Sequence, residues 1–277
     1  NFIRPNWRDI HQQFQQVDVV VNMVGVMSNY DTILEQVHRH TPVQMASMAK
    51  QSGVKRWINL SALGANANHS VAFAASKGRG DDELLAQSDD NFEVTIVRPS
   101  LVFGPGGVSC EMFIKLARLS LLALPNGGHY QIQPVHVNDV AQGLVALATR
   151  SFNQVQTQAD IQISHSINTA ILPNIINFTG AQIGTLAEYL TMMRRDIHGL
   201  SVPKIITIAD GLSKAGVRLI KPFSNGMIGP DSLVLLEQGS VATHQILTEL
   251  LGHEPLGFDD FVRFDKLASN DTFHVKP

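Results

Sequence analysis

The sequence predicts an α/β protein built on a parallel sheet, and two patterns support this prediction. In the first hundred residues, continuous apolar runs alternate with segments of about 15 residues that have helical spacing. Such runs are typical of strands buried on both faces, and their alternation with helices is typical of βαβ crossovers. The chain has 277 residues, of which 44% are hydrophobic and 16% charged, so it is long enough to bury a large core.

Three strands and two helices are predicted before residue 100. Gly53 follows the first helix, and a glycine commonly ends a helix. The βαβ crossovers between the strands are expected to be right-handed. The predicted elements are a strand at Val17–Gly25, a helix at Asp31–Gln51, a strand at Lys55–Gly64, a helix at Ala72–Ala86 and a strand at Phe92–Ser100.

The pattern changes after Pro99, which suggests a second region. The glutamine-rich segment 151–170 predicts an exposed loop or an irregular hairpin, and the chain from about Ile208 onward is expected to be mostly helical. We divide the chain into a domain at 1–150 and a smaller, mostly helical C-terminal subdomain at 151–277, partly interleaved with the first. The other predicted elements are a loop at Val102–Gly107, a helix at Cys110–Leu124, a strand and a helix within Ile132–Arg150, a strand at Asn174–Gly180, a helix at Thr185–Ile197 and a strand at Val202–Thr207.

Composition and missing motifs exclude several classes of function. The net charge of −3 and the lack of a basic run give no reason to expect a nucleic-acid partner. Cys110 is the only cysteine, so no disulfide forms within the chain, and no apolar run is long enough to span a membrane. The sequence has no H-E-x-x-H zinc motif and no G-x-S-x-G hydrolase motif, and we predict no metal site.

Five segments carry a resemblance to a known family: RDIHQQFQQVDVVVNMVG, GVKRWINLSALGA, SKGRGDDELL, VTIVRPSLVFGPG and QPVHVNDVAQGLVAL. Because these segments occur in the order found in the family, the chain resembles the extended, atypical short-chain dehydrogenase/reductase superfamily. The resemblance is to its NAD-dependent epimerase/dehydratase-like members. Within the superfamily, the chain is most similar to the branch of 39-kDa-type NAD(P)H-binding accessory subunits of respiratory complex I. The resemblance is good over residues 5–150 and loose beyond them, and it implies a Rossmann-like, doubly wound parallel sheet.

The chain departs from the family at its beginning. Family members open with a strand and a glycine-rich turn that holds the cofactor pyrophosphate. No G-x-G-x-x-G or G-x-x-G-x-x-G occurs in these 277 residues. Asn6 matches a family Asp near the adenine. The sheet of 1–150 is therefore expected to be a partial NAD(P)-binding Rossmann domain, N-terminally incomplete, as in a truncated chain.

The family's catalytic residues are a serine after one strand and Tyr-x-x-x-Lys on the next helix. Ser61 matches the serine and Lys77 the lysine, but Phe73 stands at the tyrosine position. Phenylalanine has no hydroxyl to relay a proton. None of the three tyrosines is followed by lysine four residues later, and Ser70 or Ser76 would be poor acids. The resemblance therefore implies an inactive catalytic site.

The resemblance also implies a cofactor site for NAD(P)H. In the family, the backbone at the positions of Asn22, Val24 and Gly25 passes under the cofactor, and the residues after the third predicted strand face the nicotinamide. Ligands of parallel sheets bind at the carboxyl ends of the strands, in agreement with these positions. The expected cofactor-binding residues are Asn6, Asn22, Val24, Gly25, Ser61, Lys77, Pro99, Ser100 and Val102.

Three interpretations of function remain open. The favoured one is a non-catalytic NAD(P)H-binding protein with an accessory, assembly or sensing role, whose partner is respiratory complex I or another protein. It would lie on the cytoplasmic or matrix side, peripheral to an inner membrane. The second is an active NAD(P)-dependent nucleotide-sugar epimerase/dehydratase or reductase. The third is a protein-interaction module without nucleotide.

Overall fold

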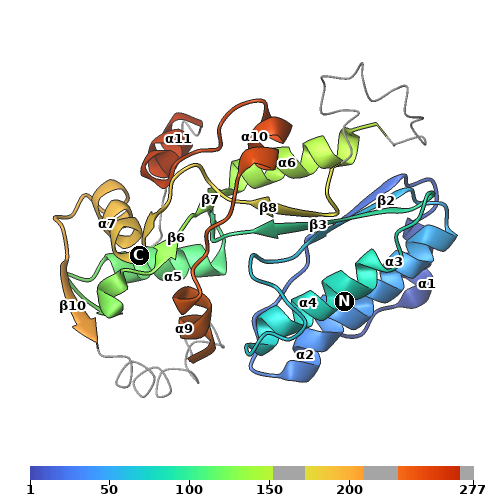
Figure 1. Ribbon diagram of the computed structural model, residues 1–277, viewed down its shortest axis with the longest axis horizontal. Coiled ribbons are helices and arrows are strands. Elements are labelled where there is room, and N and C mark those ends of the chain that lie inside the picture. The colour runs from blue at the N-terminus through green and yellow to red at the C-terminus, as the bar shows by residue number, and fades with distance from the viewer. Residues whose placement is uncertain (152–171, 209–229, 269–277) are drawn as a thin grey trace. The chain divides into compact units, whose positions relative to one another are not determined.

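The computed structural model describes residues 1–151, 172–208 and 230–268, which form two compact units (Figure 1). The glutamine-rich segment predicted as a loop, and the beginning of the region expected to be helical from Ile208, lie outside the described residues. Each unit is built from several stretches of chain, and the division at residue 150 remains a prediction. The first unit comprises Asn1–Pro99, Ala141–Phe178 and Gln245–His253, and the second comprises Ser100–Val140, Thr179–His244 and Glu254–Pro277.

A parallel sheet forms the centre of the first unit, which confirms the predicted α/β fold class. Its four strands lie in the order β1-β2-β3-β8, and all three pairings are parallel. The three predicted strands before residue 100 and the strand predicted at Asn174–Gly180 are all present, shortened at their ends. The strands are β1 (Val19–Asn22), β2 (Arg56–Leu60), β3 (Glu93–Pro99) and β8 (Ile175–Phe178).

Helices cover both faces of this sheet (Figure 1). α1, α2, α3 and α4 lie on one face, and α6 and α10 on the other. The predicted helix at Asp31–Gln51 is interrupted by a π-helical turn at Gln36–His40. The bounds are α1 (Trp7–Gln13), α2 (Asp31–Glu35), α3 (Thr41–Gln51), α4 (Ala72–Leu85), α6 (Val137–Thr149) and α10 (Gln245–Leu251).

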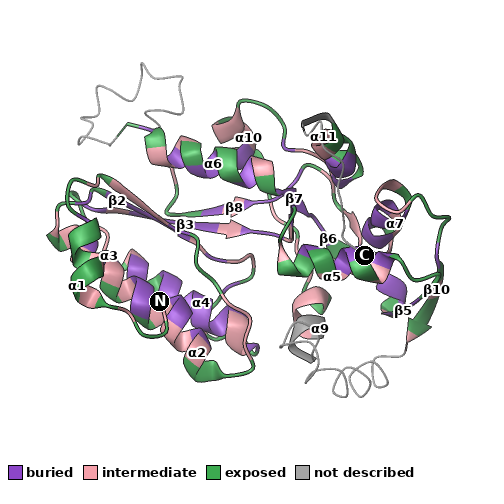
Figure 2. Cartoon of the chain, turned by 180° about the vertical axis from the view of Figure 1, so that it is seen from behind, coloured by how far each residue is buried: buried purple, intermediate pink, exposed green. Residues whose placement is uncertain are grey.

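The register assigns each strand residue to one face of the sheet. Trp57 pairs with Val94, and both pack with Leu84 of α4 in one apolar cluster. Successive side chains of a strand point to opposite faces. Arg56, one residue before Trp57, therefore points to the α6 face, where its side chain bonds the carbonyl of Leu147. Figure 2 shows buried residues along α4 and the strands, whereas α1 has none.

The second unit contains a smaller parallel pair and corrects one prediction. The helix predicted at Cys110–Leu124 ends at Ala117, and a strand follows it. In this strand Leu122 and Leu124 are buried while Leu121 is exposed, which is the period of a strand. A short run of leucines fits a helix and a strand equally well. Only the pairing of this run with Lys204–Ile208 shows that it is a strand. The elements are α5 (Val108–Ala117), β5 (Leu121–Pro125), α7 (Leu186–Asp196) and β10 (Lys204–Ile208), with β5 paired to β10.

Short elements complete the second unit. β4 pairs with β7 in parallel, and β6 pairs with β9 in antiparallel orientation. The loop predicted at Val102–Gly107 thus begins with a two-residue strand. The remaining elements are β4 (Val102–Phe103), β6 (Gln131–Ile132), β7 (Val135–His136), β9 (Gly184–Thr185), α9 (Pro230–Glu237) and α11 (Phe261–Ala268), with 3₁₀ turns at Asn126–Gly128 and Phe258–Asp260.

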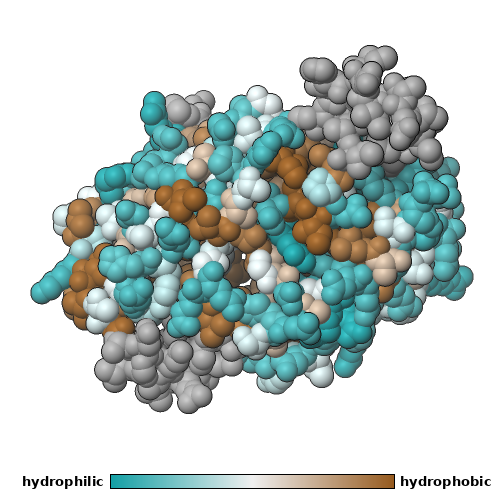
Figure 3. All heavy atoms as spheres, in the orientation of Figure 1, coloured by the Kyte–Doolittle hydropathy of each residue, from teal (hydrophilic) through white to brown (hydrophobic). Residues whose placement is uncertain are grey.

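The outer side of the β5–β10 pair is apolar. Leu121 and Ile206 are 49% and 40% exposed, and Figure 3 shows hydrophobic surface over these strands. Among the described helices, none has both the length and the hydropathy that a membrane span requires.

Candidate functional site

A buried polar cluster lies where β1, β2 and β3 end. Asn22 ends β1, Asn59 and Ser61 lie at the end of β2, and Arg98 lies near the end of β3. Asp81 reaches them from α4 and is 1% exposed. The cluster occupies the carboxyl edge of the sheet, where parallel sheets bind their ligands.

Asp81 is the hub of this cluster. Its Oδ2 accepts the hydroxyl proton of Ser61 at 2.7 Å, and Nε and Nη2 of Arg98 at 3.1 and 2.9 Å. Its Oδ1 accepts the amide of Asn59 at 3.4 Å, and Asn59 in turn accepts the amide of Asn22 at 2.7 Å. Burial raises the pKa of Asp81, while Ser61 and Arg98 act in the opposite direction. The cluster thus joins three strands to α4 through one carboxylate.

Lys77 lies one helical turn before Asp81 on α4. Its side chain is 8% exposed, and its Nζ donates to the carbonyl of Leu60 at 3.3 Å. The ammonium also lies 5.6 Å from the centre of the Phe73 ring. Burial lowers the pKa of Lys77 from 10.5 to about 8, against the opposing effect of Asp81. An ammonium has three N–H donors, so two of them have no hydrogen-bond acceptor among the described residues.

Two glycines allow α4 to lie close to its neighbours. A Cβ on Gly78 would meet the backbone of Asn66 at 2.2 Å, and a Cβ on Gly80 would meet the carbonyl oxygen of His38 at 2.1 Å. Glycine inside a helix costs about 0.5–1 kcal/mol relative to alanine. Here close packing accounts for both glycines, because any side chain would push the helix that carries Lys77 out of place.

His38, from the π-helical turn, is buried beside Phe73. Its Nε2 accepts the backbone N–H of Val26 at 3.1 Å, so the ring proton lies on Nδ1, which contacts the Ser76 hydroxyl at 2.9 Å. The Ser76 hydroxyl donates to the carbonyl of Phe73 at 3.0 Å. The His38 ring meets the Phe73 ring edge-on at 5.3 Å. Burial and the Lys77 charge lower the pKa of His38 to about 3, so the ring is neutral.

The structure brings most residues predicted in the first unit to one place. Asn22 and Ser61 belong to the Asp81 cluster. Gly25 is exposed, and a Cβ placed on it would lie 3.5 Å from Nζ of Lys77. Val24, next to it, is 40% exposed, and its N–H donates to Asn22 Oδ1 at 3.2 Å. Gly25 and Phe73 thus lie beside the Lys77 ammonium.

The other predicted residues lie elsewhere. Pro99 is buried at the end of β3, and its carbonyl accepts the N–H of Leu63 at 2.9 Å. Asn6 precedes α1, and its amide donates to Asp9 at 2.7 Å; no described hydrogen bond joins it to the Asp81 cluster. Ser100 and Val102 belong to the second unit. Their roles beside a cofactor therefore remain predictions.

Sequence reasoning missed four residues of the site, namely Asn59, Arg98, Asp81 and His38. Asp81 had a usable signal, because it follows Lys77 by four residues and side chains with that spacing share a helix face. His38 had no such signal, because its partners Val26 and Ser76 are brought to it by the fold.

None of the predicted residues lines the surface hollow of the second unit. That hollow has a volume of about 390 Å³. It is lined by α7, by Ile205 of β10 and by the 3₁₀ turn that contains Phe258 and Asp259. Its polar groups include Glu188, which caps α7, and Arg195, which is paired with Asp196 and Asp259. We place the candidate site at Lys77 instead, because this buried ammonium has one hydrogen-bond acceptor for its three N–H donors among the described residues.

Comparisons with curated proteins find relatives of two kinds. The 40 kDa subunit of mitochondrial NADH-ubiquinone oxidoreductase from Neurospora crassa is 30% identical over 219 residues, 76% of this chain and 52% of that protein. UDP-glucose 4-epimerase from Vibrio cholerae is 30% identical over 161 residues, 50% of this chain and 48% of that enzyme. The chain thus spans about half the length of these curated relatives.

The solved structures show the same fold. UDP-glucuronic acid 4-epimerase from Bacillus cereus, in complex with UDP-glucuronic acid and NAD, matches with a TM-score of 0.60 and 13% identity, over 95% of this chain and 77% of that one. A family model described as the NAD dependent epimerase/dehydratase family matches residues 3–163. The family is described as NAD dependent, and this match and the likeness to the Neurospora subunit confirm the resemblance inferred from the sequence. The chain belongs to the NAD-dependent epimerase/dehydratase family.

Proposed function

We propose that the first unit binds NAD(P)H through the nicotinamide-ribose half of the cofactor and does not turn it over. The observation that carries this proposal is the Lys77 ammonium, which is buried yet has two N–H donors without an acceptor in the part of the chain that the structure describes. A buried charged group without partners is costly, so such a group suits a ligand that brings oxygen acceptors. Ribose hydroxyls are acceptors of this kind.

The surroundings of Lys77 fit this half of the cofactor. Gly25 is exposed beside the ammonium and has no side chain to cover it. The Phe73 ring gives the site an apolar wall. When bound, the cofactor supplies a hydride donor or acceptor, while the chain binds and orients it. The 277 residues contain no glycine-rich phosphate loop, so we assign no residue to the diphosphate.

The neighbouring groups support a site without catalysis. Phe73 has no hydroxyl, and the Ser61 proton is donated to Asp81. The Ser76 proton is donated to the Phe73 carbonyl, and the acceptor nitrogen of neutral His38 is occupied by Val26. The hydrogen bonds of these side chains are thus made within the protein, and none of them replaces the tyrosine hydroxyl as the proton donor.

The properties of Lys77 favour one alternative to a non-catalytic protein, namely an active enzyme. Lys77 has unused N–H donors and a pKa lowered to about 8, so it is the one remaining acid in this cluster of described residues. A reductase or epimerase in which Lys77 replaces the tyrosine as proton donor is therefore the second candidate. The identity to UDP-glucose 4-epimerase from Vibrio cholerae is in line with it.

We further propose an accessory, assembly or sensing role with a protein partner on the matrix or cytoplasmic side of an inner membrane. The likeness to the Neurospora subunit of NADH-ubiquinone oxidoreductase supports this role. Under this proposal, the tagged full-length protein co-purifies with respiratory complex I in a nucleotide-dependent way. A protein-interaction module without nucleotide would co-purify equally well with and without NADPH.

Nucleotide titration of the purified chain tests the binding proposal. NADPH and NADH are added in turn, and binding is followed by the fluorescence of the reduced nicotinamide. Lys77→Met is expected to weaken binding at least about tenfold, because one charge-assisted hydrogen bond contributes about 1.5–3 kcal/mol. Lys115→Met, at an exposed lysine of α5, is the matched control and leaves binding unchanged. If neither nucleotide binds to the wild-type chain, the proposal is wrong.

Turnover assays separate the two candidate functions. The wild-type chain should not oxidise NADPH with carbonyl substrates or interconvert nucleotide sugars. Activity that is lost in Lys77→Met would establish the second candidate. Phe73→Tyr places a hydroxyl where the family has one, and activity in that variant alone would show that the missing hydroxyl is what prevents catalysis.

A further inference from the structure

The segment that follows β1 is held in place by two side chains. The N–H of Val24 donates to Asn22 Oδ1 at 3.2 Å, and the N–H of Val26 donates to His38 Nε2 at 3.1 Å. Gly25 lies between these two amides, next to the Lys77 ammonium. The backbone conformation at Gly25 thus depends on one residue of its own strand and on one from a different element.

His38 is itself fixed on three sides. Its carbonyl lies against Gly80 of α4, so close that a Cβ there would be 2.1 Å away. Its Nδ1 contacts the Ser76 hydroxyl at 2.9 Å, also on α4. Its ring meets the Phe73 ring edge-on. The residue lies in a π-helical turn, a local distortion that is frequent at functional sites. His38 therefore ties the segment after β1 to the helix that carries Lys77.

The hydrogen bond to Val26 requires a neutral ring. A protonated imidazole has two donors and no acceptor, so it could not accept the Val26 N–H. The charged groups near the ring are Lys77, which opposes protonation, and Glu35, which favours it less strongly. Glu35 is itself paired with Arg39 and Arg79. The contact is therefore maintained over the ordinary pH range.

We propose that His38 is a positioning residue of the nucleotide site, which holds Val24–Val26 beside Lys77 so that this backbone and the ammonium face the cofactor together. This inference rests on the proposed NAD(P)H binding. His38 does not touch the nucleotide; it acts through the Val26 amide. Its neighbour His40 is exposed and serves as a matched control.

Two variants of His38 separate hydrogen bonding from packing. His38→Leu fills the space without an acceptor, whereas the amide of His38→Gln can accept from Val26 and donate to Ser76. We expect His38→Leu to weaken NADPH binding about tenfold and to speed amide exchange at Val26. His38→Gln should restore both, and His40→Leu should change neither. In the wild type, ¹⁵N shifts should show a protonated Nδ1 and an unprotonated Nε2, with no titration of His38 between about pH 5 and 8.

Each outcome bears on the proposal. Equal NADPH affinity in His38→Leu and His38→Gln would overturn the positioning role, as would unchanged Val26 exchange in His38→Leu. A wild-type Nδ1 without a proton would overturn the assigned contact. If the wild-type chain binds neither NADPH nor NADH while the Val26 amide remains protected by His38, the proposed function fails, and with it the role toward a cofactor, although the contact itself stands.

Discussion

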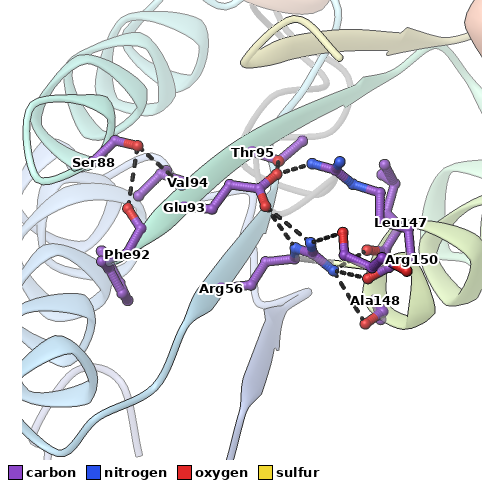
Figure 4. A network of polar contacts seen from close by, with 10 residues as sticks. Arg56, Ser88, Phe92, Glu93, Val94, Thr95, Leu147, Ala148 and Arg150 are labelled. Carbon is purple, nitrogen blue, oxygen red and sulfur yellow. Dashed lines mark hydrogen bonds and ion pairs between the residues drawn. The ribbon is translucent and has the colours of Figure 1, made fainter. Parts of the chain in front are cut away.

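Two buried charged clusters lie on opposite faces of the same sheet, and they use their hydrogen bonds differently. Arg56 of β2 points to the α6 face, where it meets Glu93 of β3 and the end of α6 (Figure 4). Asp81 and Lys77 of α4 lie on the other face. Both clusters contain a cation that is at least nine-tenths buried. The comparison shows which buried charge serves the fold and which one is suited to a ligand.

The Arg56 side chain is satisfied within the protein, although Nε and Nη1 of its neighbour Arg150 have no hydrogen-bond partner among the described residues. Nε and Nη2 of Arg56 both reach Glu93 Oε2 at 2.9 Å. Nη1 donates to the carbonyls of Leu147 and Arg150, each at 2.9 Å, and Nη2 donates to that of Ser151 at 3.3 Å. All five donors of the guanidinium thus have acceptors, and three of these are carbonyls in or just after the last turn of α6.

The Lys77 side of the molecule is not satisfied in this way. Asp81 accepts from Ser61, Arg98 and Asn59, but Lys77 has a single carbonyl partner. The difference predicts that Arg56 contributes chiefly to the stability of the fold. Lys77, in contrast, is expected to oppose stability and, under the proposed function, to contribute to ligand binding.

The largest expected effect is the loss of Arg56. Arg56→Met should lower the free energy of unfolding by about 3–5 kcal/mol, because the helix end loses its donors and Glu93 loses a buried partner. Denaturant unfolding measures this change. Lys55→Met is the control, because the neighbouring lysine forms an exposed pair with Asp18, for which a change below about 1 kcal/mol is expected. Equal losses in both variants would contradict the assigned role of Arg56.

The pH dependence of stability tests Lys77. The pKa of Lys77 is about 8 in the fold, below the ordinary lysine value of 10.5, so the unfolded chain binds the proton more tightly. Stability due to this group is therefore lowest below about pH 8 and rises as the pH approaches about 10.5. Lys77→Met lacks this penalty, and its stability advantage over wild type should shrink by about 3 kcal/mol across that range. A constant difference would contradict a lowered pKa.

The smallest expected change in stability is that caused by substituting Asp81, the hub of the polar cluster. Asp81→Asn should cost about 2 kcal/mol, because Arg98 and Ser61 lose a charged acceptor. Removing the carboxylate also removes the attraction that raises the Lys77 pKa, so the pH transition above should move to lower pH. Asp82→Asn, at the exposed neighbouring position, is the control and should change neither quantity. A similar response of both variants would show that Asp81 is not the hub.

Local patterns were sufficient for much of the fold. The apolar runs Val17–Gly25, Lys55–Gly64 and Phe92–Ser100 predicted three strands of a parallel sheet, because such runs suit strands covered on both faces. The run Leu121–Leu124 was ambiguous, and its pairing with β10 decided that it is a strand. Short apolar segments carry too little periodicity to separate the two states.

For the candidate site, the sequence by itself determined the helix that carries Phe73 and Lys77 and the strand end at Ser61, because these depend on spacing within single elements. Only the tertiary structure decided where the proton of Ser61 goes, that His38 holds Val26, and that Lys77 has donors to spare. Those properties depend on partners far apart in the chain, whose positions are set by the packing of α4 through Gly78 and Gly80 against its neighbours. Hydrogen bonds and burial between distant segments leave no periodic trace in the sequence, because each is a property of two segments rather than of one.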